Sequence, residues 1–320
     1  MKIASVVIAA TLLASTASAA AEGSVPGAKA VKACAAAGPF WPTMTLALDG
    51  NTAWVACKEQ SRVVRVNTAT GKLVNSVRLD TPVIAVKSGL GAVWAVDSAS
   101  TLYRIDPKTS RITRRASLGA RAAYNVWIGG GSVWVADDQA AQVLRVAPAS
   151  GKVLRRLAVG DGPASMAFSG RSGWVINHRD RRLMRIDLTT NKVTELQPVP
   201  GDAPERMVYL AGSLWLTGRG TDLVRVDPQT GKALATIEIG AGGIDVVAAA
   251  GSLWVPTRSA AVDPTGLPTM ETLQRVSATT QRVTTAATAN GRVDVHGLVA
   301  ASGYVWLADN RTGVLYRMRA

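Results

Sequence analysis

The stretch GGSVWVADDQAAQVLRVAPASGKVLRRLAVG, residues 130–160, decides the fold because variants of it recur along the whole chain. Its tryptophan lies in a small-x-aliphatic-Trp pattern that returns at intervals of 40, 40, 40, 41, 39 and 52 residues, at Trp54, Trp94, Trp134, Trp174, Trp215, Trp254 and Trp306. An arginine flanked by aliphatic residues follows 10 or 11 residues later, or 21 in the sixth unit, at Arg65, Arg104, Arg145, Arg185, Arg225, Arg275 and Arg317. Such a fixed period indicates a repeat architecture.

Each repeat predicts four short strands. Runs rich in Val, Ile, Leu, Thr and Trp alternate with Gly, Asn, Asp and Pro, without helical periodicity. We expect Trp on the second strand, Arg on the third, and a turn such as Asp227-Pro228-Gln229-Thr230-Gly231 between the third and fourth. Gly71, Gly151, Asn191 and Gly231 stand where such a hairpin needs positive φ. A period near 40 with four strands per unit predicts an all-β, seven-bladed β-propeller, which we place in one domain over residues 20–320.

The two ends of the chain are expected to close the ring. The seventh unit stops on its third strand, at Tyr316, Arg317 and Met318, while residues 27–38 resemble the fourth strand of another unit at residues 151–162. The N-terminal strand should therefore complete the last blade and cover its open edge. Cys34 would lie on that strand and Cys57 just after Trp54, so a disulfide would fix the closure; two free buried thiols are the alternative.

The beginning of the chain predicts export. Lys2, an apolar run over residues 3–14, and Ala17-Ser18-Ala19 fit a cleavable signal peptide over residues 1–19. The apolar run is shorter than the roughly 20 residues that a membrane span needs. We therefore expect a periplasmic or secreted protein that is not inserted in a membrane.

The net charge of +14 arises largely from the repeat. The seven strand arginines recur blade by blade, and so do the basic turn residues Lys72, Arg111, Lys152, Lys192, Lys232 and Arg282. A packing role for each Arg against its Trp, through its apolar stem and a cation–π contact, explains the repetition better than a ligand-binding code. Scattered charges without a basic stripe do not indicate nucleic-acid binding, and we expect a monomer.

Asymmetry marks the candidate binding site. In a propeller, the entrances of the first strands and the loops after the second strands share one face around the central channel, and here the entrance positions differ in every blade. We expect this face to recognise a small molecule or an exported partner protein without turnover and without a cofactor. The candidate ligand-binding residues are Tyr124, Asp137, His178, Glu205, Arg206 and Asp245. The alternative is that these polar loop ends are simply solvated.

An insertion in the sixth unit, near residues 258–271, belongs on the same face. It is either a lid over the channel mouth or an inert surface insertion.

The pattern Gly-x-Val-Trp-Val-Ala-Asp, followed by Leu-x-Arg-Ile-Asp-Pro-x-Thr-Gly-Lys, resembles the virginiamycin B lyase (streptogramin lyase) family and the periplasmic YVTN-repeat propellers across the mature chain. The resemblance to the lyases implies metal-assisted elimination by an acid-x-His pair and an acid after the next Trp. Asp294, His296 and Asp309 match those positions and would hold Mg²⁺ or Mn²⁺, with His296 as general base.

The chain departs from the lyase pattern at three points. Asp294 and Asp309 stand where the family has glutamates, one residue is missing between His296 and the final acid, and Ile244 followed by Asp245 replaces a second histidine. No nucleophile elbow, His-Glu-x-x-His motif or P-loop occurs. A carbon–oxygen lyase acting on a cyclic ester or related small substrate is thus the alternative to recognition, and His296 as a hydrogen-bonded channel residue is the alternative to catalysis.

Overall fold

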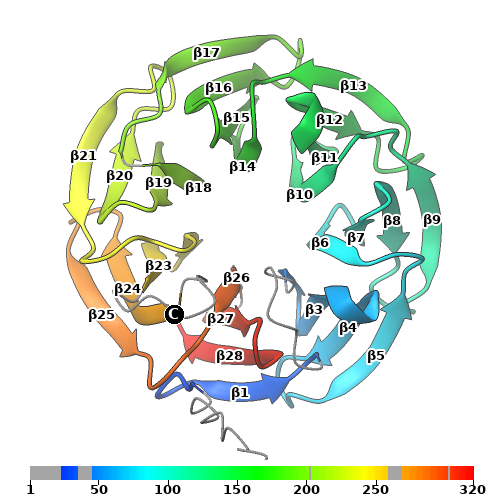
Figure 1. Cartoon of the computed structure of the whole chain (residues 1–320), viewed down its shortest axis with the longest axis horizontal. Helices are drawn as coiled ribbons and strands as arrows, with labels where there is room; N and C mark the ends of the chain where they lie inside the picture. Colours follow the sequence, from blue (N-terminus) through cyan, green and yellow to red (C-terminus); the bar gives the residue numbers. More distant parts are fainter. Residues whose placement is uncertain (1–22, 35–44, 202, 259–268, 302) are drawn as a thin grey trace, which may run out of the picture.

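A computed structural model of the chain describes residues 23–34, 45–201, 203–258, 269–301 and 303–320, including the backbone but not the side chain of His296. The predicted signal peptide and most of the sixth-unit insertion lie outside these ranges. The described residues form seven antiparallel four-stranded sheets arranged in a ring around a central channel (Figure 1). The predicted seven-bladed propeller is therefore confirmed.

Within each blade the strands run outward from the channel in chain order. Blade one contains β2 (Leu46–Asp49), β3 (Thr52–Cys57), β4 (Arg62–Asn67) and β5 (Leu73–Arg78). Blade two contains β6 (Val83–Gly89), β7 (Ala92–Asp97), β8 (Thr101–Ile105) and β9 (Ile112–Ser117). Blade three contains β10 (Ala123–Gly129), β11 (Ser132–Asp137), β12 (Gln142–Val146) and β13 (Val153–Ala158). Blade four contains β14 (Pro163–Ser169), β15 (Ser172–Asn177), β16 (Arg182–Asp187) and β17 (Val193–Pro198).

The remaining blades follow the same order, except that the last borrows its outer strand. Blade five contains β18 (Pro204–Leu210), β19 (Ser213–Gly218), β20 (Asp222–Val226) and β21 (Ala233–Glu238). Blade six contains β22 (Val247–Ala249), β23 (Ser252–Arg258), β24 (Met270–Ser277) and β25 (Val283–Thr288). Blade seven contains β26 (Val295–Ala301), β27 (Tyr304–Asp309), β28 (Val314–Arg319) and β1 (Lys29–Lys32). Two 3₁₀ turns, η1 (Lys58–Gln60) and η2 (Asp138–Ala140), follow β3 and β11.

The repeated Trp and Arg pack as the sequence predicts. In every blade the Trp of the second strand lies directly across from the Arg of the third. Six of the arginines place their guanidinium groups 5.4–6.0 Å from the centre of the Trp ring. Blade four differs, because Trp174 stacks on Tyr209 with 5.5 Å between the ring centres. The Nε of Arg185 still donates a hydrogen bond to Ser172, as the strand arginines of blades three, five and six do to the equivalent serines. The arginines therefore serve the ring rather than a ligand.

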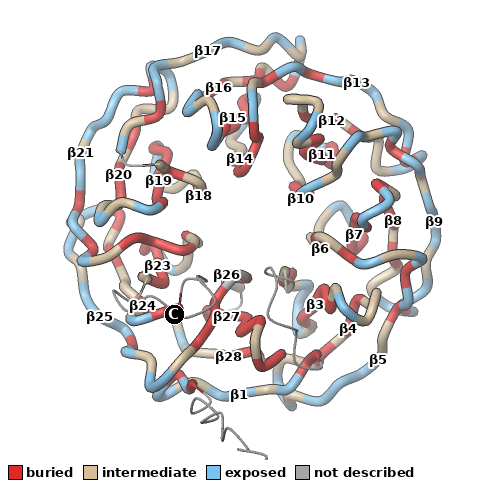
Figure 2. The backbone as a smooth tube through the Cα atoms, viewed as in Figure 1, coloured by how far each residue is buried: buried red, intermediate tan, exposed pale blue. Residues whose placement is uncertain are grey.

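Apolar cores lie between neighbouring blades. Trp54 and Val63 of blade one, for example, share one cluster with Val93 and Ile105 of blade two. Burial is concentrated in the middle strands of each blade, and most of the exposed residues within strands belong to the outer strands (Figure 2). Because each blade covers its faces only with its neighbours, the ring must close for every core to be complete.

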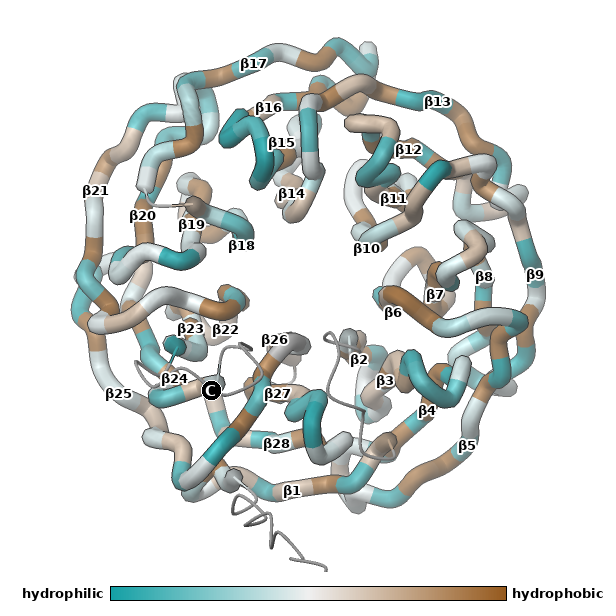
Figure 3. The backbone as a smooth tube through the Cα atoms, in the orientation of Figure 1, coloured by the Kyte–Doolittle hydropathy of each residue, from teal (hydrophilic) through white to brown (hydrophobic). Residues whose placement is uncertain are grey.

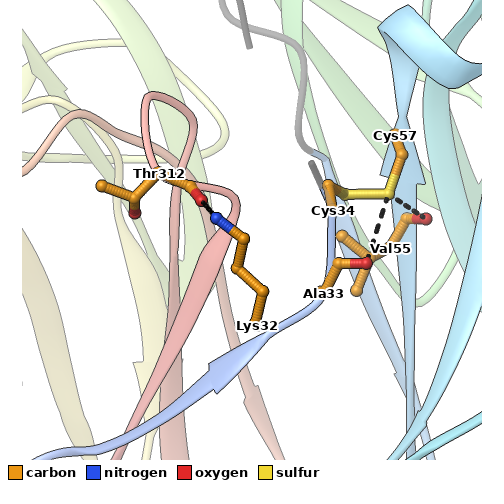
Figure 4. The surroundings of a disulfide bond; sticks show 6 residues. All are labelled: Lys32, Ala33, Cys34, Val55, Cys57 and Thr312. Carbon is orange, nitrogen blue, oxygen red and sulfur yellow. Dashed lines mark hydrogen bonds between the residues drawn. A yellow bond between two sulfur atoms is a disulfide. The ribbon is translucent and has the colours of Figure 1, made fainter. Parts of the chain in front are cut away.

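The N-terminal segment closes the ring as predicted. β1 pairs antiparallel with β28, from Lys29 opposite Arg317 to Lys32 opposite Val314. A disulfide joins Cys34, just beyond β1, to Cys57 at the end of β3, with 5.6 Å between their Cα atoms (Figure 4). The Nζ of Lys32 also donates to the carbonyl of Thr312. Blade seven is thus linked covalently to blade one. No helix among the described residues is long and apolar enough to span a membrane.

Candidate functional site

A cavity of about 620 Å³ lies in the central channel. Every blade contributes residues to its wall from or next to the innermost strand, and Lys58 of η1 adds a residue from a connecting loop. The hydropathy of these innermost strands varies around the ring, from the more hydrophobic β6 to the more hydrophilic β18 (Figure 3). The cavity therefore has chemically distinct sides, although the fold around it is repetitive.

Four polar side chains from four blades gather in this cavity. Lys87 comes from β6, Tyr124 from β10, Arg206 from β18, and Asp245 from the segment just before β22. The Nε of Arg206 lies 3.9 Å from Oδ1 of Asp245, and Tyr124 interacts electrostatically with the Arg206 guanidinium and helps to raise its pKa. Asp245 also accepts a hydrogen bond from the backbone N–H group of Val246 at 2.8 Å. Three of the predicted ligand-binding residues are thus brought together.

Burial makes the charges in this cavity costly. It lowers the pKa of the Lys87 ammonium, against the attraction of Asp245, and Arg206 lowers that pKa further. Burial likewise raises the pKa of the Asp245 carboxyl, while Arg206 and Lys87 act in the opposite sense. Perturbed ionisable groups in a cavity are typical of functional sites, although structural ion pairs show them too.

A second group of charges lies beside Arg206. Glu205 accepts a hydrogen bond from the Nε of Arg219 at 3.0 Å. Arg258 lies at the end of β23 and interacts electrostatically with Glu205, Arg219 and Arg206. Burial lowers the pKa of its guanidinium. The buried Nε of Arg258 has no hydrogen-bond partner within the described part of the chain. In this second group, as among the four residues in the cavity, basic side chains outnumber acidic ones.

The other three predicted ligand-binding residues, Glu205, Asp137 and His178, do not line the described cavity. The carboxylate of Asp137 is buried and accepts hydrogen bonds from the backbone of Arg121 and Ala122, at 3.0 Å each, and from Gln142 at 2.9 Å. The Nδ1 of His178 lies 2.8 Å from the carbonyl oxygen of Gly162 on an exposed loop. Through these contacts, Asp137 and His178 join segments that connect neighbouring strands.

The two carboxylates predicted for catalysis are buried and held by protein donors. Asp294 accepts hydrogen bonds from the Nε and a terminal nitrogen of Arg292, at 3.1 Å each. Asp309 accepts from the Thr312 hydroxyl at 2.6 Å, from the backbone of Arg311 at 3.1 Å and from that of Asp294 at 3.3 Å. Burial raises the pKa of the Asp309 carboxyl.

This arrangement does not supply a ready set of metal ligands. Leaving aside the His296 side chain, which is not described, the described residues contain no group of three or more His, Cys, Asp and Glu that could hold a metal ion. The oxygens of Asp294 and Asp309 accept hydrogen bonds from protein donors, so these carboxylates are already engaged within the protein. A cation at blade seven stays a prediction.

Sequence reasoning missed Lys87. The residue paired with each repeat Trp on the innermost strand is Ala47, Lys87, Trp127, Ala167, Val208, Val247 or Val299. Lys87 is the one charged member of this set. It stands seven residues before its repeat Trp, whereas the predicted entrance positions lie nine or ten residues before theirs, so a comparison of the seventh position across the repeats would have found it.

Together these features define the class: a seven-bladed β-propeller with an asymmetric, charged cavity in its channel. A crystal structure that shares the fold is that of selenomethionine-substituted virginiamycin B lyase from Staphylococcus aureus, with a TM-score of 0.75. The two sequences are 17% identical, and the match covers 93% of this chain and 100% of that chain. The similarity confirms the predicted resemblance at the level of the fold. No family model and no curated protein sequence matches the chain.

Proposed function

We propose that this protein is an exported binding protein that recognises a small molecule in its central channel without chemical turnover. The observation that carries the proposal is the convergence of Lys87, Tyr124, Arg206 and Asp245 on one cavity of about 620 Å³. Small-molecule sites are concave, usually about 300–1,000 Å³, and combine apolar walls with a few placed polar groups. The concave shape favours a small molecule over the flat surface of a partner protein, and the Cys34–Cys57 disulfide supports export.

A thermal-shift screen tests this function. A ligand that binds the native state alone raises the melting temperature, so a compound library should contain molecules that stabilise the parent protein. Arg206→Ala and Tyr124→Ala should each remove that stabilisation, because both side chains line the cavity. Arg155→Ala is the matched control, since Arg155 is exposed on the outer strand β13. Stabilisation that survives both cavity substitutions would show that the ligand binds elsewhere.

Metal-assisted elimination at blade seven is the second candidate. Its support is the fold shared with virginiamycin B lyase and the position of Asp309 at 3.3 Å from the backbone nitrogen of Asp294, which lies two residues before His296. Purified protein would be offered lactone and streptogramin-type substrates with Mg²⁺, Mn²⁺ or a chelator, alongside His296→Ala. Turnover that falls about 10²-fold or more on removing the general base would establish a lyase and end the proposal of binding without turnover. No turnover with any metal, or equal turnover by the variant, removes this candidate.

A further inference from the structure

The cavity wall carries more positive than negative charge. Three basic residues, Lys58, Lys87 and Arg206, line it, against one acidic residue, Asp245. Arg219 and Arg258 add two more cations near Arg206, against Glu205 alone. Cationic groups enclosed by low-dielectric walls focus a positive potential into the space between them.

Asp245 does not fully neutralise the two cations Arg206 and Lys87. It lies 3.9 Å from Arg206, longer than a hydrogen bond, and its carboxylate already accepts a backbone hydrogen bond from Val246. No hydrogen bond or ion pair holds the Lys87 ammonium among the described residues, where the charges acting on it are the attractive Asp245 and the repulsive Arg206. A half-buried ammonium without a close partner is unfavourable unless something else supplies the negative charge.

The same cavity offers apolar surface beside these cations. Ile84, Val208, Val247 and Val299 line it and are partly accessible, and Tyr124 is 45% exposed. A hydrated inorganic ion would leave this surface unused. An organic body would bury it and gain free energy in proportion to the apolar area removed from water.

We propose, as an extension of the function proposed above, that the ligand is a small organic anion whose carboxylate or phosphate group binds between Lys87 and Arg206 while its apolar body lies against the innermost strands. Tyr124 lines the cavity together with Arg206, interacts with its guanidinium and forms part of the apolar wall. Charge-assisted hydrogen bonds to the anion would be the strongest contacts in the site.

Isothermal titration calorimetry with matched probes tests this assignment. Benzoate and phenyl phosphate carry the two anionic groups on an aromatic body, benzamide is the neutral counterpart of benzoate, and inorganic phosphate lacks the apolar body. We expect at least one of the aromatic anions to bind, and benzamide and inorganic phosphate to bind at least tenfold more weakly than that anion. Lys87→Met should weaken the anion at least tenfold and leave benzamide unchanged. Lys152→Met, the same substitution on an exposed turn, should behave like the parent.

The outcomes separate this inference from the function on which it rests. Any one of four results overturns the anion assignment. The first two are benzamide binding as tightly as benzoate, and inorganic phosphate binding as tightly as phenyl phosphate. The other two are anion binding that is unchanged in Lys87→Met, and no binding of either aromatic anion at millimolar concentration. If Arg206→Ala still abolishes binding of a neutral compound from the screen, recognition in the channel stands without it. If cavity substitutions change the binding of no compound, both proposals fail. Melting curves of each variant establish that it is folded.

Discussion

Lys87 is costly to the folded protein at neutral pH because its ammonium is half-buried without a close counter-ion. Burial lowers its pKa from the ordinary value of 10.5, so the native chain releases this proton at a lower pH than the unfolded chain does. Below the folded-state pKa the full cost is present, and the cost is relieved as pH rises towards 10.5. Residues that serve a binding site often carry such a penalty.

We therefore predict that Lys87→Met stabilises the protein while it weakens anion binding. Removing the buried charge and keeping the apolar stem should raise the melting temperature at pH 7 by roughly 2–4 °C, which corresponds to about 1 kcal/mol in a domain of this size. The difference from the parent should shrink as pH rises through the folded-state pKa of Lys87. Melting curves from pH 7 to pH 10 measure it. A lower melting temperature at pH 7 would show that Lys87 stabilises the fold instead.

Asp309 gives the opposite prediction, because its carboxylate is a buried acceptor for the backbone of the following loop and for Thr312. Asp309→Ala should lower the free energy of unfolding by roughly 2 kcal/mol, since it leaves buried donors without an acceptor. Urea unfolding measures the change. Asp161→Ala is the control, because the ion pair of Asp161 with Arg179 is largely exposed and should contribute little. Equal stability of Asp309→Ala and the parent would show that Asp309 does not have this structural role, and a catalytic role would then be open to it.

The sequence repeat by itself indicates this structural role of Asp309. Asp97, Asp137 and Asp309 each end the second strand of their blade, and each accepts hydrogen bonds from nearby backbone N–H groups. A residue that recurs at one blade position usually serves the blade. The location of Lys87 beside Asp245 could not be predicted, because it depends on side chains that meet across the channel from blades far apart in sequence.

At the scale of the elements, the turn between the third and fourth strands follows closely from local sequence. Asp106, Asp187 and Asp227 each accept two backbone hydrogen bonds at 2.8 Å, from the residues two and three positions later. Asn67 does the same in blade one at 2.9 Å. The predicted positive φ is also present, for example 71° at Gly71, where a Cβ would approach the Val31 side chain of the closing strand to 2.9 Å.

These turns should give the protein part of its sensitivity to acid. Backbone hydrogen bonds lower the pKa of all three aspartates below 3.8, so their stabilising effect is complete above that pH and is lost as pH falls through the folded-state values. The triple substitution of Asp106, Asp187 and Asp227 by Asn keeps the acceptor oxygen, as Asn67 shows. We expect a melting temperature close to the parent's at pH 7 and a smaller fall between about pH 4 and pH 2. Parallel acid-dependent losses in the two proteins would contradict this.

Strand order and the Trp–Arg pairs were predictable because they depend on local repeats, but two departures were not. In blade four the Trp174–Tyr209 stack replaces the expected cation–π contact, since Tyr209 reaches it from the next blade. In blade six β22 has three residues, and the preceding Gly243 makes an isolated bridge to Thr257. A side chain at Gly243 would lie 1.9 Å from Oγ1 of Thr217 in blade five. Such contacts between blades are not encoded in the pattern of one repeat.

At the scale of the whole molecule, stability depends on closure. β1 supplies the outer strand of blade seven, Val25 packs in the core with blades six and seven, and the Tyr316 hydroxyl donates to the carbonyl of Gly23 at 2.9 Å. The disulfide then holds this segment to β3. Hydrogen bonding, packing and a covalent link thus act on the same short piece of chain, and their contributions can be separated by substitution.

Deleting residues 23–34 should leave the outer edge of β28 unpaired and expose the core beneath it, so the product should aggregate or associate edge to edge. The double substitution of Cys34 and Cys57 by Ser keeps β1 and removes only the constraint between residues 23 apart in sequence. By loop entropy that costs roughly 3 kcal/mol, and the protein should remain monomeric. Size-exclusion chromatography with light scattering, and urea unfolding of the double variant, measure both effects. A truncated protein that stays monodisperse with an unchanged melting curve would show that the ring is closed by contacts other than the N-terminal strand. Aggregation of the double-Ser variant to the same extent as the truncation would assign closure to the disulfide rather than to β1.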